Sequence, residues 1–523
     1  MSSQRSNRLA IVLLVLCASC ATSGSTATSA DERLDAPASW GSLAEDVVLV
    51  GGFGRVAALA VSQTRAFVAG DGGIAIYDRL GSRWLVPAPL RGAREILVDR
   101  MGRGTYIYAN GWWILSSDRT LLPLSPGQAP SRDEVIPSPD AQQILRETPG
   151  LQSFGALLTR DAQLRTWPLS VLARAPERNE IWAGTNGGGV FVVDPVFLRS
   201  TQMPYGLRNR SATALALAAD GVWIAEEPDA AAAPDLAITF ASEDLTTWRW
   251  LSPAHGAYAV AAMTVREHYA CMSTTIGAIV VDLESSTPAV PRLHAYTQLG
   301  DPTSAWATPA GCWVGGTSGF TRLPWPSDSA ARAITFSNNG AASAFASSGD
   351  TTWIATMAGV RVHVSGSTDG GEAAAGASHA ALFEALPAAL PNALRGPIRA
   401  LTLAGAGLAL VTDRELWLTS GPARLSSAVR VEAPIDRLGR IRRIAGDERT
   451  LWLAGSRGAA AFSLRDHRWQ YVTPSGATGA GGFAIDLDRA REVRDVVLSA
   501  RVAWLATAAG VVRVARGADG MPR

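Results

Sequence analysis

The chain has 523 residues, of which 18% are charged and 47% hydrophobic, and its formal net charge is +1. This is the composition of an ordinary folded protein, and so small a net charge argues against binding to nucleic acid or to a membrane surface by charge alone. Every basic side chain is arginine. The lack of lysine excludes a phosphate-binding P-loop and Schiff-base chemistry, which both need a lysine amine.

The N-terminus has the features of an export signal. Residues 1–8 are basic, and they are followed by the apolar run LAIVLLVLCA and then by small residues. The run is too short to span a bilayer. The stretch LCASC resembles a bacterial lipobox, in which a cysteine after two small residues carries the lipid, although Cys17 stands where that pattern usually has leucine. The resemblance implies that Cys20 is the lipid anchor, and plain secretion with cleavage near Ala21 is the alternative.

This N-terminal pattern sets the expected domain organisation. We predict a lipoprotein signal peptide over 1–20, a flexible tether rich in Ser, Thr and Ala over 21–41, and a folded part over 42–523. By the sorting tendency of lipobox proteins, alanine after the cysteine implies a bacterial outer-membrane lipoprotein, acylated (palmitate) at its N-terminus. Whether the folded part faces the periplasm or the outside is left open.

The folded part repeats one pattern ten times. Seven copies place a bulky residue six positions before a turn glycine, and three copies keep only the flanking pattern. The seven pairs are Phe67 and Gly73, Trp182 and Gly188, Cys271 and Gly277, Trp313 and Gly319, Trp353 and Gly359, Trp452 and Gly458, and Trp504 and Gly510; the other three copies carry Tyr106, Trp223 and Ala409. A period near 40 residues built from short alternating strands indicates β-propeller blades. We predict that the bulky residue packs between blades.

Two further resemblances support the same fold. The phrase of tryptophan, small apolar residues, a turn glycine and another apolar run resembles the two-component-regulator-type propeller repeat over most of 55–516. The stretch SEDLTTW, 242–248, resembles the Asp-box turn of sialidase-type propellers, with Thr246 where that motif has glycine. Both resemblances imply architecture and no particular activity, because propellers host many unrelated functions.

The two ends of the repeat region suggest how the ring closes. The last copy lacks a fourth strand, and residues 45–52 form a strand without a blade of its own. If the first segment supplies the missing strand, both ends meet in one blade and no edge is left exposed. We therefore predict an all-β fold, a single large closed propeller of about ten four-stranded blades, with two smaller propellers as the alternative.

Four insertions interrupt the repeats, near 125–152, 226–235, 366–379 and 475–491, and the first contains a predicted helical turn over 140–147. All but the third are expected on one face of the disc, where loops on a rigid scaffold usually carry binding residues. The second insertion is acidic. It is either a contact for a cation or a basic partner, or a solvated loop, and its carboxylates are Glu226, Glu227, Asp229 and Asp235.

No set of catalytic residues accompanies the repeats. The six histidines stand alone, the pattern G-x-S-x-G is missing, and no pair of acids can be assigned to glycoside chemistry. We predict no metal, no cofactor and no enzymatic activity. Cys271 and Cys312 fall in neighbouring blades, where they form either a disulfide close to the axis or two buried thiols.

Together these features predict a non-catalytic scaffold or binding module of the cell envelope. Its expected partner is an envelope protein complex or a surface polysaccharide, held against the loop-rich face, with no nucleic acid involved. One alternative is a glycan- or peptide-processing lyase or hydrolase with its site at the mouth of the channel. Another is a subunit of an outer-membrane assembly complex.

Overall fold

The computed structural model describes residues 46–523 except 103, 118–120, 137–140, 163, 176–178, 230–236, 253–258, 285–291, 296–298, 327–332, 338–339, 358, 365–383, 386–390, 392–393, 395, 423 and 473–491. The fold is all-β and of the β-propeller type, as predicted. The described residues form ten four-stranded antiparallel sheets. None of the described helices is long and apolar enough to cross a membrane.

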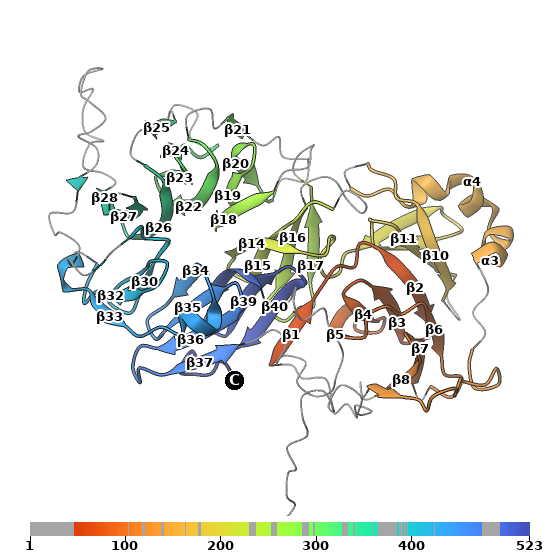
Figure 1. The fold of residues 1–523 in the computed structure, drawn as a ribbon. Helices are drawn as coiled ribbons and strands as arrows, with labels where there is room; N and C mark the ends of the chain where they lie inside the picture. Colours follow the sequence, from red (N-terminus) through yellow and green to blue (C-terminus); the bar gives the residue numbers. More distant parts are fainter. Residues whose placement is uncertain are drawn as a thin grey trace, which may run out of the picture.

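Three sheets, formed by the first part of the chain, make up what we call the lobe (right-hand side of Figure 1, red to yellow). They are β2 (Val56–Val61), β3 (Arg65–Gly70), β4 (Gly73–Asp78) and β5 (Arg83–Ala88); β6 (Glu95–Val98), β7 (Gly104–Tyr108), β8 (Trp112–Ser116) and β9 (Leu121–Pro123); and β10 (Leu169–Arg174), β11 (Ile181–Thr185), β12 (Val190–Asp194) and β13 (Arg199–Met203). The innermost strand β2 contacts both β6 and β10, so the sheet β2–β5 lies between the other two.

Seven sheets form the rest of the structure. The first four are β14 (Ala212–Leu217), β15 (Gly221–Glu226), β16 (Ile238–Ser242) and β17 (Trp248–Leu251); β18 (Val260–Arg266), β19 (Tyr269–Thr274), β20 (Gly277–Asp282) and β21 (Arg292–Ala295); β22 (Pro302–Thr308), β23 (Gly311–Gly316), β24 (Gly319–Leu323) and β25 (Ile334–Ser337); and β26 (Ala342–Ser348), β27 (Thr351–Thr356), β28 (Gly359–Val364) and β29 (Glu384–Ala385).

The last three sheets are β30 (Ala400–Ala404), β31 (Gly407–Val411), β32 (Leu416–Leu418) and β33 (Val429–Val431); β34 (Ile441–Gly446), β35 (Thr450–Gly455), β36 (Gly458–Ser463) and β37 (Trp469–Val472); and β38 (Val493–Leu498), β39 (Val502–Thr507), β40 (Gly510–Ala515) and β1 (Val47–Val50). A 3₁₀ turn, Leu425–Ser427, and a short helix α5, Ile435–Leu438, connect strands in this part.

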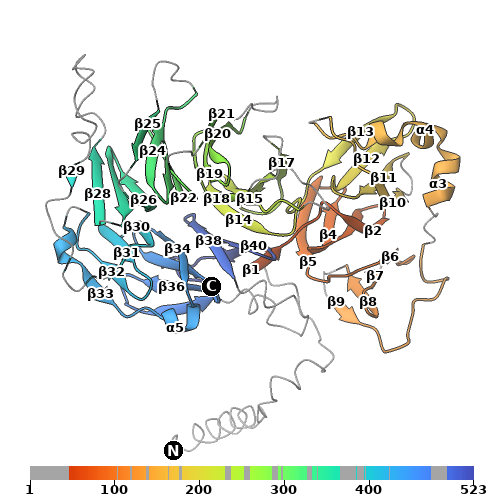
Figure 2. The ribbon, with the colours of Figure 1, turned by 45° about the horizontal axis from the view of Figure 1, so that its top comes forward.

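The first strands of these seven sheets contact one another in a cycle. β14 contacts β18, and contacts then follow in order through β22, β26, β30, β34 and β38, which in turn contacts β14. We call this group the seven-sheet ring (Figures 1 and 2). The prediction of one ring through all ten blades is wrong, because β38 is the neighbour of β14 and not of a lobe strand. The repeat pattern alone does not encode which inner strands are neighbours.

The predicted meeting of the two chain ends is confirmed. β1 pairs with β40 in antiparallel register, from Val47 opposite Val514 to Val50 opposite Val511. β1 therefore forms the outermost strand of the sheet whose other three strands come from the C-terminal residues. The first and the last of the described strands thus lie in one sheet. In the sequence, the lobe is inserted between β1 and β14.

The repeated bulky residue is a packing residue, as predicted. All ten positions lie in the second strand of a sheet and all ten side chains are buried. They are Phe67, Tyr106, Trp182, Trp223, Cys271, Trp313, Trp353, Ala409, Trp452 and Trp504. Burying a large side chain between sheets contributes about 1.5–3 kcal/mol, which explains why the pattern recurs in each sheet.

The insertion near 125–152 contains the predicted helical turn, α3 (Ala141–Glu147), and leads into a second helix, α4 (Pro149–Leu158). These helices do not form a free binding loop. Ile144, Leu151 and Leu158 pack against buried residues of the sheet β10–β13, including Phe191. The helices thus cover the face of this sheet that points away from the rest of the lobe (Figure 2).

Cys271 of β19 and Cys312 of β23 form a disulfide between neighbouring sheets of the ring, with their Cα atoms 5.5 Å apart. Of the two alternatives left open by the sequence, the structure contains the bonded pair. Both cysteines are fully buried in the core between the two sheets. The disulfide therefore fastens two adjacent sheets in addition to their apolar contacts.

Candidate functional site

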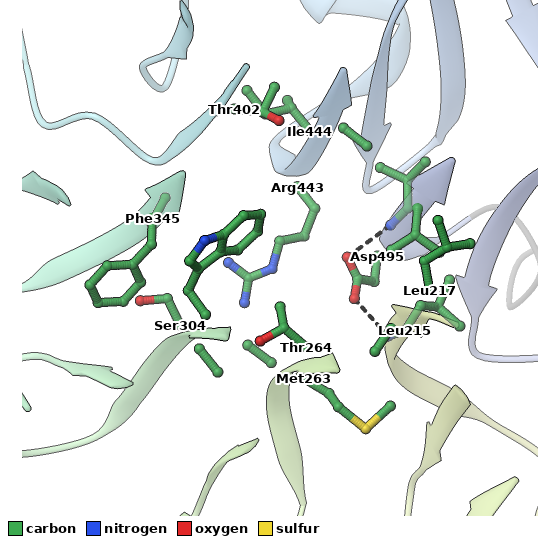
Figure 3. Close-up of a pocket in the computed structure, with 18 of the residues that line it drawn as sticks. Leu215, Leu217, Met263, Thr264, Ser304, Phe345, Thr402, Arg443, Ile444 and Asp495 are labelled. Carbon is green, nitrogen blue, oxygen red and sulfur yellow. Dashed lines mark hydrogen bonds between the residues drawn. The ribbon is translucent and has the colours of Figure 1, made fainter. Parts of the chain in front are cut away.

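The axis of the seven-sheet ring is a channel of about 310 Å³, lined by all seven inner strands (Figure 3). Most of the lining is aliphatic or small, and two charged side chains project into it, Arg443 of β34 and Asp495 of β38. Leu217, at the end of β14, lines the channel and is 37% exposed, so this end of the channel reaches solvent. The channel is the candidate functional site.

A β-bulge directs both charged side chains inward. The register of β34 with β35 shifts between Ile441 and Arg443, and that of β38 with β39 shifts between Val493 and Asp495. A bulge adds one residue to a strand and re-aims the side chain that follows it. Arg443 and Asp495 thus occupy equivalent positions in adjacent sheets.

Arg443 reaches across the channel. Its Nη2 donates hydrogen bonds to the carbonyl oxygens of Ala261 on β18, at 3.0 Å, and Thr303 on β22, at 2.9 Å. These strands lie on the opposite side of the cycle from β34, so one side chain connects three sheets. Its Nε and Nη1 make no hydrogen bond to another described residue, and Figure 3 shows the guanidinium in the middle of the channel.

Asp495 is held by the backbone. Its two carboxylate oxygens accept hydrogen bonds from the amides of Leu215 and Val496, both at 2.8 Å. The side chain faces Arg443 across the channel (Figure 3). Burial raises the pKa of Asp495 to about 6, and the positive charge of Arg443 and the two amides oppose that rise.

Sequence reasoning missed both charged residues, yet the sequence contains a signal for them. In five other sheets the residue directly after the bulge is small or aliphatic. These residues are Ala58, Val171, Ala214, Ala262 and Ala344, and a sixth sheet has Ser304. Aligning the inner strands on the bulge would have singled out an arginine and an aspartate at adjacent repeats.

The raised pKa of Asp495 makes stability depend on pH. The pKa lies above the usual 3.8 in the folded chain, so the protonated form stabilises the fold below pH 4, and this contribution is lost as pH rises through about 6. The Asp495→Asn variant should lack this dependence. Its unfolding free energy relative to the parent should change by at most about 1.4 kcal/mol per pH unit between pH 4 and 6. Urea titrations of both proteins across this range test the expectation; parallel curves would contradict it.

The first carboxylate of the acidic insertion 226–235 is not exposed, contrary to the expectation from the sequence. Glu226, the last residue of β15, is fully buried, at 0% exposure. Its carboxylate accepts hydrogen bonds from the amides of Arg208 and Asn209 and from the Thr239 hydroxyl. Burial raises the pKa of Glu226 to about 7, although these hydrogen bonds favour the ionised form. Glu226 is a structural residue and cannot contact a partner.

The other acidic candidates divide into three cases. Glu227 forms an ion pair with Arg494, at 2.8 Å, and is half-exposed. Asp229 lies near Arg210, whose pKa is raised mainly by its ion pair with Asp71 and slightly by Asp229. Asp235 is outside the described residues, as are Cys20 and the insertions 366–379 and 475–491. Of the three described carboxylates, Glu226 is therefore buried, whereas Glu227 pairs with Arg494 and Asp229 lies near Arg210.

Glu226 instead anchors the connection between the lobe and the ring. Two chain segments cross between them, 51–55 after β1 and 204–211 before β14. They run side by side: the amide of Phe53 donates to the carbonyl of Leu207, at 2.7 Å, and the amide of Leu207 donates to the carbonyl of Gly51, at 3.1 Å. The carboxylate of Glu226 accepts hydrogen bonds from the amides of the next two residues of the second segment, Arg208 and Asn209.

Aromatic packing reinforces the crossing. The ring of Tyr205 lies 4.9 Å from Phe53, 4.5 Å from Trp84 of the lobe and 5.3 Å from Trp248 of the ring. Arg208 is buried against Trp167 of the lobe, at 4.5 Å, and donates a hydrogen bond to Ser252 in the seven-sheet part. One apolar core continues from the lobe into the ring, so the two parts are packed as one body.

Comparisons with known proteins give only distant similarity. No protein-family model and no characterised protein sequence matches the chain. Among solved structures, PorZ of Porphyromonas gingivalis, a component of its type-IX secretion system, is 11% identical with a TM-score of 0.44 over 88% of this chain and 69% of that one. The extracellular domain of a hybrid two-component system of B. thetaiotaomicron has 11% identity and a TM-score of 0.38 over 88% and 68%.

A third similar structure is YCF48 bound to D1 peptide, with 11% identity and a TM-score of 0.42 over 61% of this chain and 96% of that one. At these TM-scores the similarities do not bear on function, which has to be argued from the channel and the surface.

No group of three or more His, Cys, Asp or Glu side chains in the described part of the chain is placed to hold a metal ion.

Proposed function

We propose that this protein is a non-catalytic scaffold or binding module of the bacterial cell envelope, tethered to the outer membrane through lipidated Cys20. In this proposal residues 212–515 and β1 form a seven-bladed propeller, and the lobe extends its side. The observation that carries the proposal is the state of the two charged groups in the channel. Arg443 is fixed to backbone carbonyls of two other strands, and Asp495 is fixed to one amide of β14 and one of its own strand, an arrangement that positions the groups and holds the sheets together.

The same observation weighs against glycan or peptide cleavage in the channel. Asp495 is the only carboxylate among the described lining residues, whereas glycoside hydrolysis uses two. None of the described lining residues is a histidine or cysteine. Membership of an outer-membrane assembly complex is a special case of the scaffold proposal.

The lobe supplies the partner surface in this proposal. Val196 and Phe197, in the turn between β12 and β13, are 66% and 73% exposed, and Leu80, in the equivalent turn of the neighbouring sheet, is 71% exposed. These turns lie at the same end of adjacent sheets, because the starts of β2 and β10 are joined by the hydrogen bond from Ser170 to Val56. Large apolar side chains gathered on one exposed face favour contact with a protein.

Crosslinking of the full-length protein in its own membranes, followed by affinity capture, tests this function. We expect a defined envelope protein to be captured with the parent and lost with the double variant Val196→Ser, Phe197→Ser. Val429→Ser is the matched control, because Val429 is an equally exposed valine (67%) on the ring. Capture of the monomer alone, with no crosslinked partner, would contradict the proposal. Capture of the same partner with the double variant would also contradict it.

A further inference from the structure

Arg443 and Asp495 carry opposite charges in one cavity without forming an ion pair with each other. Within the described residues, neither group has a salt-bridge partner. Arg443 is bonded to backbone carbonyls of β18 and β22, and Asp495 to one backbone amide of β14 and one of its own strand. Charged groups in a partly buried channel are costly unless their charge is matched. A direct contact would satisfy both groups, yet the bulges hold them on separate strands with channel space between them (Figure 3).

The space between the two charges retains open hydrogen-bonding groups. The Nε and Nη1 atoms of Arg443 carry donors that no described residue accepts. The hydroxyl of Thr264 on β18 is buried and has no hydrogen-bond partner among the described residues, and Thr264 lines the same channel as Arg443 (Figure 3). Arg443 is half-buried, so the Thr264 hydroxyl is the fully buried one of these groups. Buried polar atoms in folded proteins are nearly always paired, so an unpaired hydroxyl lining a cavity beside open donors favours a bound species there.

We propose that the channel binds a small zwitterion, a molecule with a carboxylate and an ammonium group. The carboxylate would accept hydrogen bonds from Nε and Nη1 of Arg443, and the ammonium would donate to Asp495. Arg443 would attract a simple anion, but Asp495 would repel it. Asp495 would attract a simple cation, but Arg443 would repel it. Only a molecule with both charges therefore complements the site. The volume of about 310 Å³ suits a molecule of amino-acid size.

Calorimetric titration of the full-length protein at pH 7.5 tests the site. The probes are glycine, β-alanine and γ-aminobutyrate, which carry the two charges at increasing separation, and acetate and methylammonium, which carry one each. We expect at least one zwitterion to bind and to bind at least tenfold more tightly than either single-charge probe. Acetate or methylammonium binding as tightly as the zwitterions would overturn the proposal, and so would no binding of any zwitterion.

Variants show where the probe binds. Arg443→Gln should weaken zwitterion binding at least tenfold, because a charge-assisted hydrogen bond is lost. Arg442→Gln is the matched control, since Arg442 is the adjacent arginine, pairs with Glu492 and does not line the channel. Unchanged affinity in Arg443→Gln, or equal weakening in both variants, would contradict the assignment.

A third variant keeps the test decisive if Arg443→Gln does not fold. Asp495→Asn removes the partner of the ammonium group and leaves Arg443 in place. It should abolish the preference for the zwitterion over acetate, and this ratio of affinities does not depend on the fraction of folded protein. A preference that persists in Asp495→Asn would overturn the proposal. Partner capture through the lobe is independent of these outcomes.

Discussion

Replacing Glu226 by alanine is expected to lower the free energy of unfolding by about 4 kcal/mol, because each of three buried donors that loses its acceptor costs about 1–3 kcal/mol. The donors are the amides of Arg208 and Asn209 and the hydroxyl of Thr239. Two of them lie in the segment that connects the lobe to the ring. Denaturant unfolding followed by tryptophan fluorescence measures the loss.

The neighbouring residue supplies the control for this experiment. Glu227 has the same charge but is half-exposed and paired with Arg494 at the surface. Its replacement by alanine should change the unfolding free energy by less than about 1 kcal/mol. Glu226→Gln, which keeps one acceptor, should fall between the two. Equal effects at both glutamates would show that Glu226 is not the anchor of the crossing.

Breaking the disulfide between β19 and β23 is expected to destabilise the folded chain by about 4 kcal/mol in the chain-entropy treatment of a loop of this length. The two cysteines are 41 residues apart in sequence, so the bond restricts a sizeable loop of the unfolded chain. The double variant Cys271→Ala, Cys312→Ala removes the bond and leaves little empty space, because alanine is only one sulfur atom smaller.

Urea unfolding with and without reductant provides the measurement. Reductant should lower the stability of the parent and leave that of the double variant unchanged. If reductant destabilises both proteins equally, its effect does not act through this bond. If the oxidised parent and the double variant are equally stable, the disulfide contributes nothing to the fold.

The repeat pattern was sufficient to predict local structure. The spacing between the bulky residue and its glycine located the second strand of seven sheets, and the flanking pattern located that of the other three. The unmatched strands at the two ends predicted the pairing of β1 with β40. The first prediction depends on a pattern that spans about 40 residues, and the second depends on the number of strands in each repeat. Both can be read directly from a sequence. The same strand assignments placed Cys271 and Cys312 in neighbouring sheets, but they left a disulfide and two buried thiols as alternatives, of which the structure contains the disulfide.

Features that depend on contacts between distant repeats could not be predicted in this way. The contact of β38 with β14, which sets the ring at seven sheets, leaves no mark in the repeat itself. Glu226 stands in an acidic stretch that resembles a solvated loop, and only the return of 208–209 to its side makes it buried. Arg443 and Asp495 were hidden because the bulge that orients them is visible only once two strands are paired.

The pairing of β1 with β40 also has a consequence for the order of events during synthesis. β1 leaves the ribosome before every other described strand, and its partner β40 leaves after all of them. The lobe contains strands that pair only with near neighbours in the sequence, so it can fold while the remaining sheets are still being made. β1 has to wait for nearly the whole chain, and contacts between such distant residues form slowly. A chain that stops before residue 510 would therefore retain the lobe but leave β1 without β40, the strand with which it pairs.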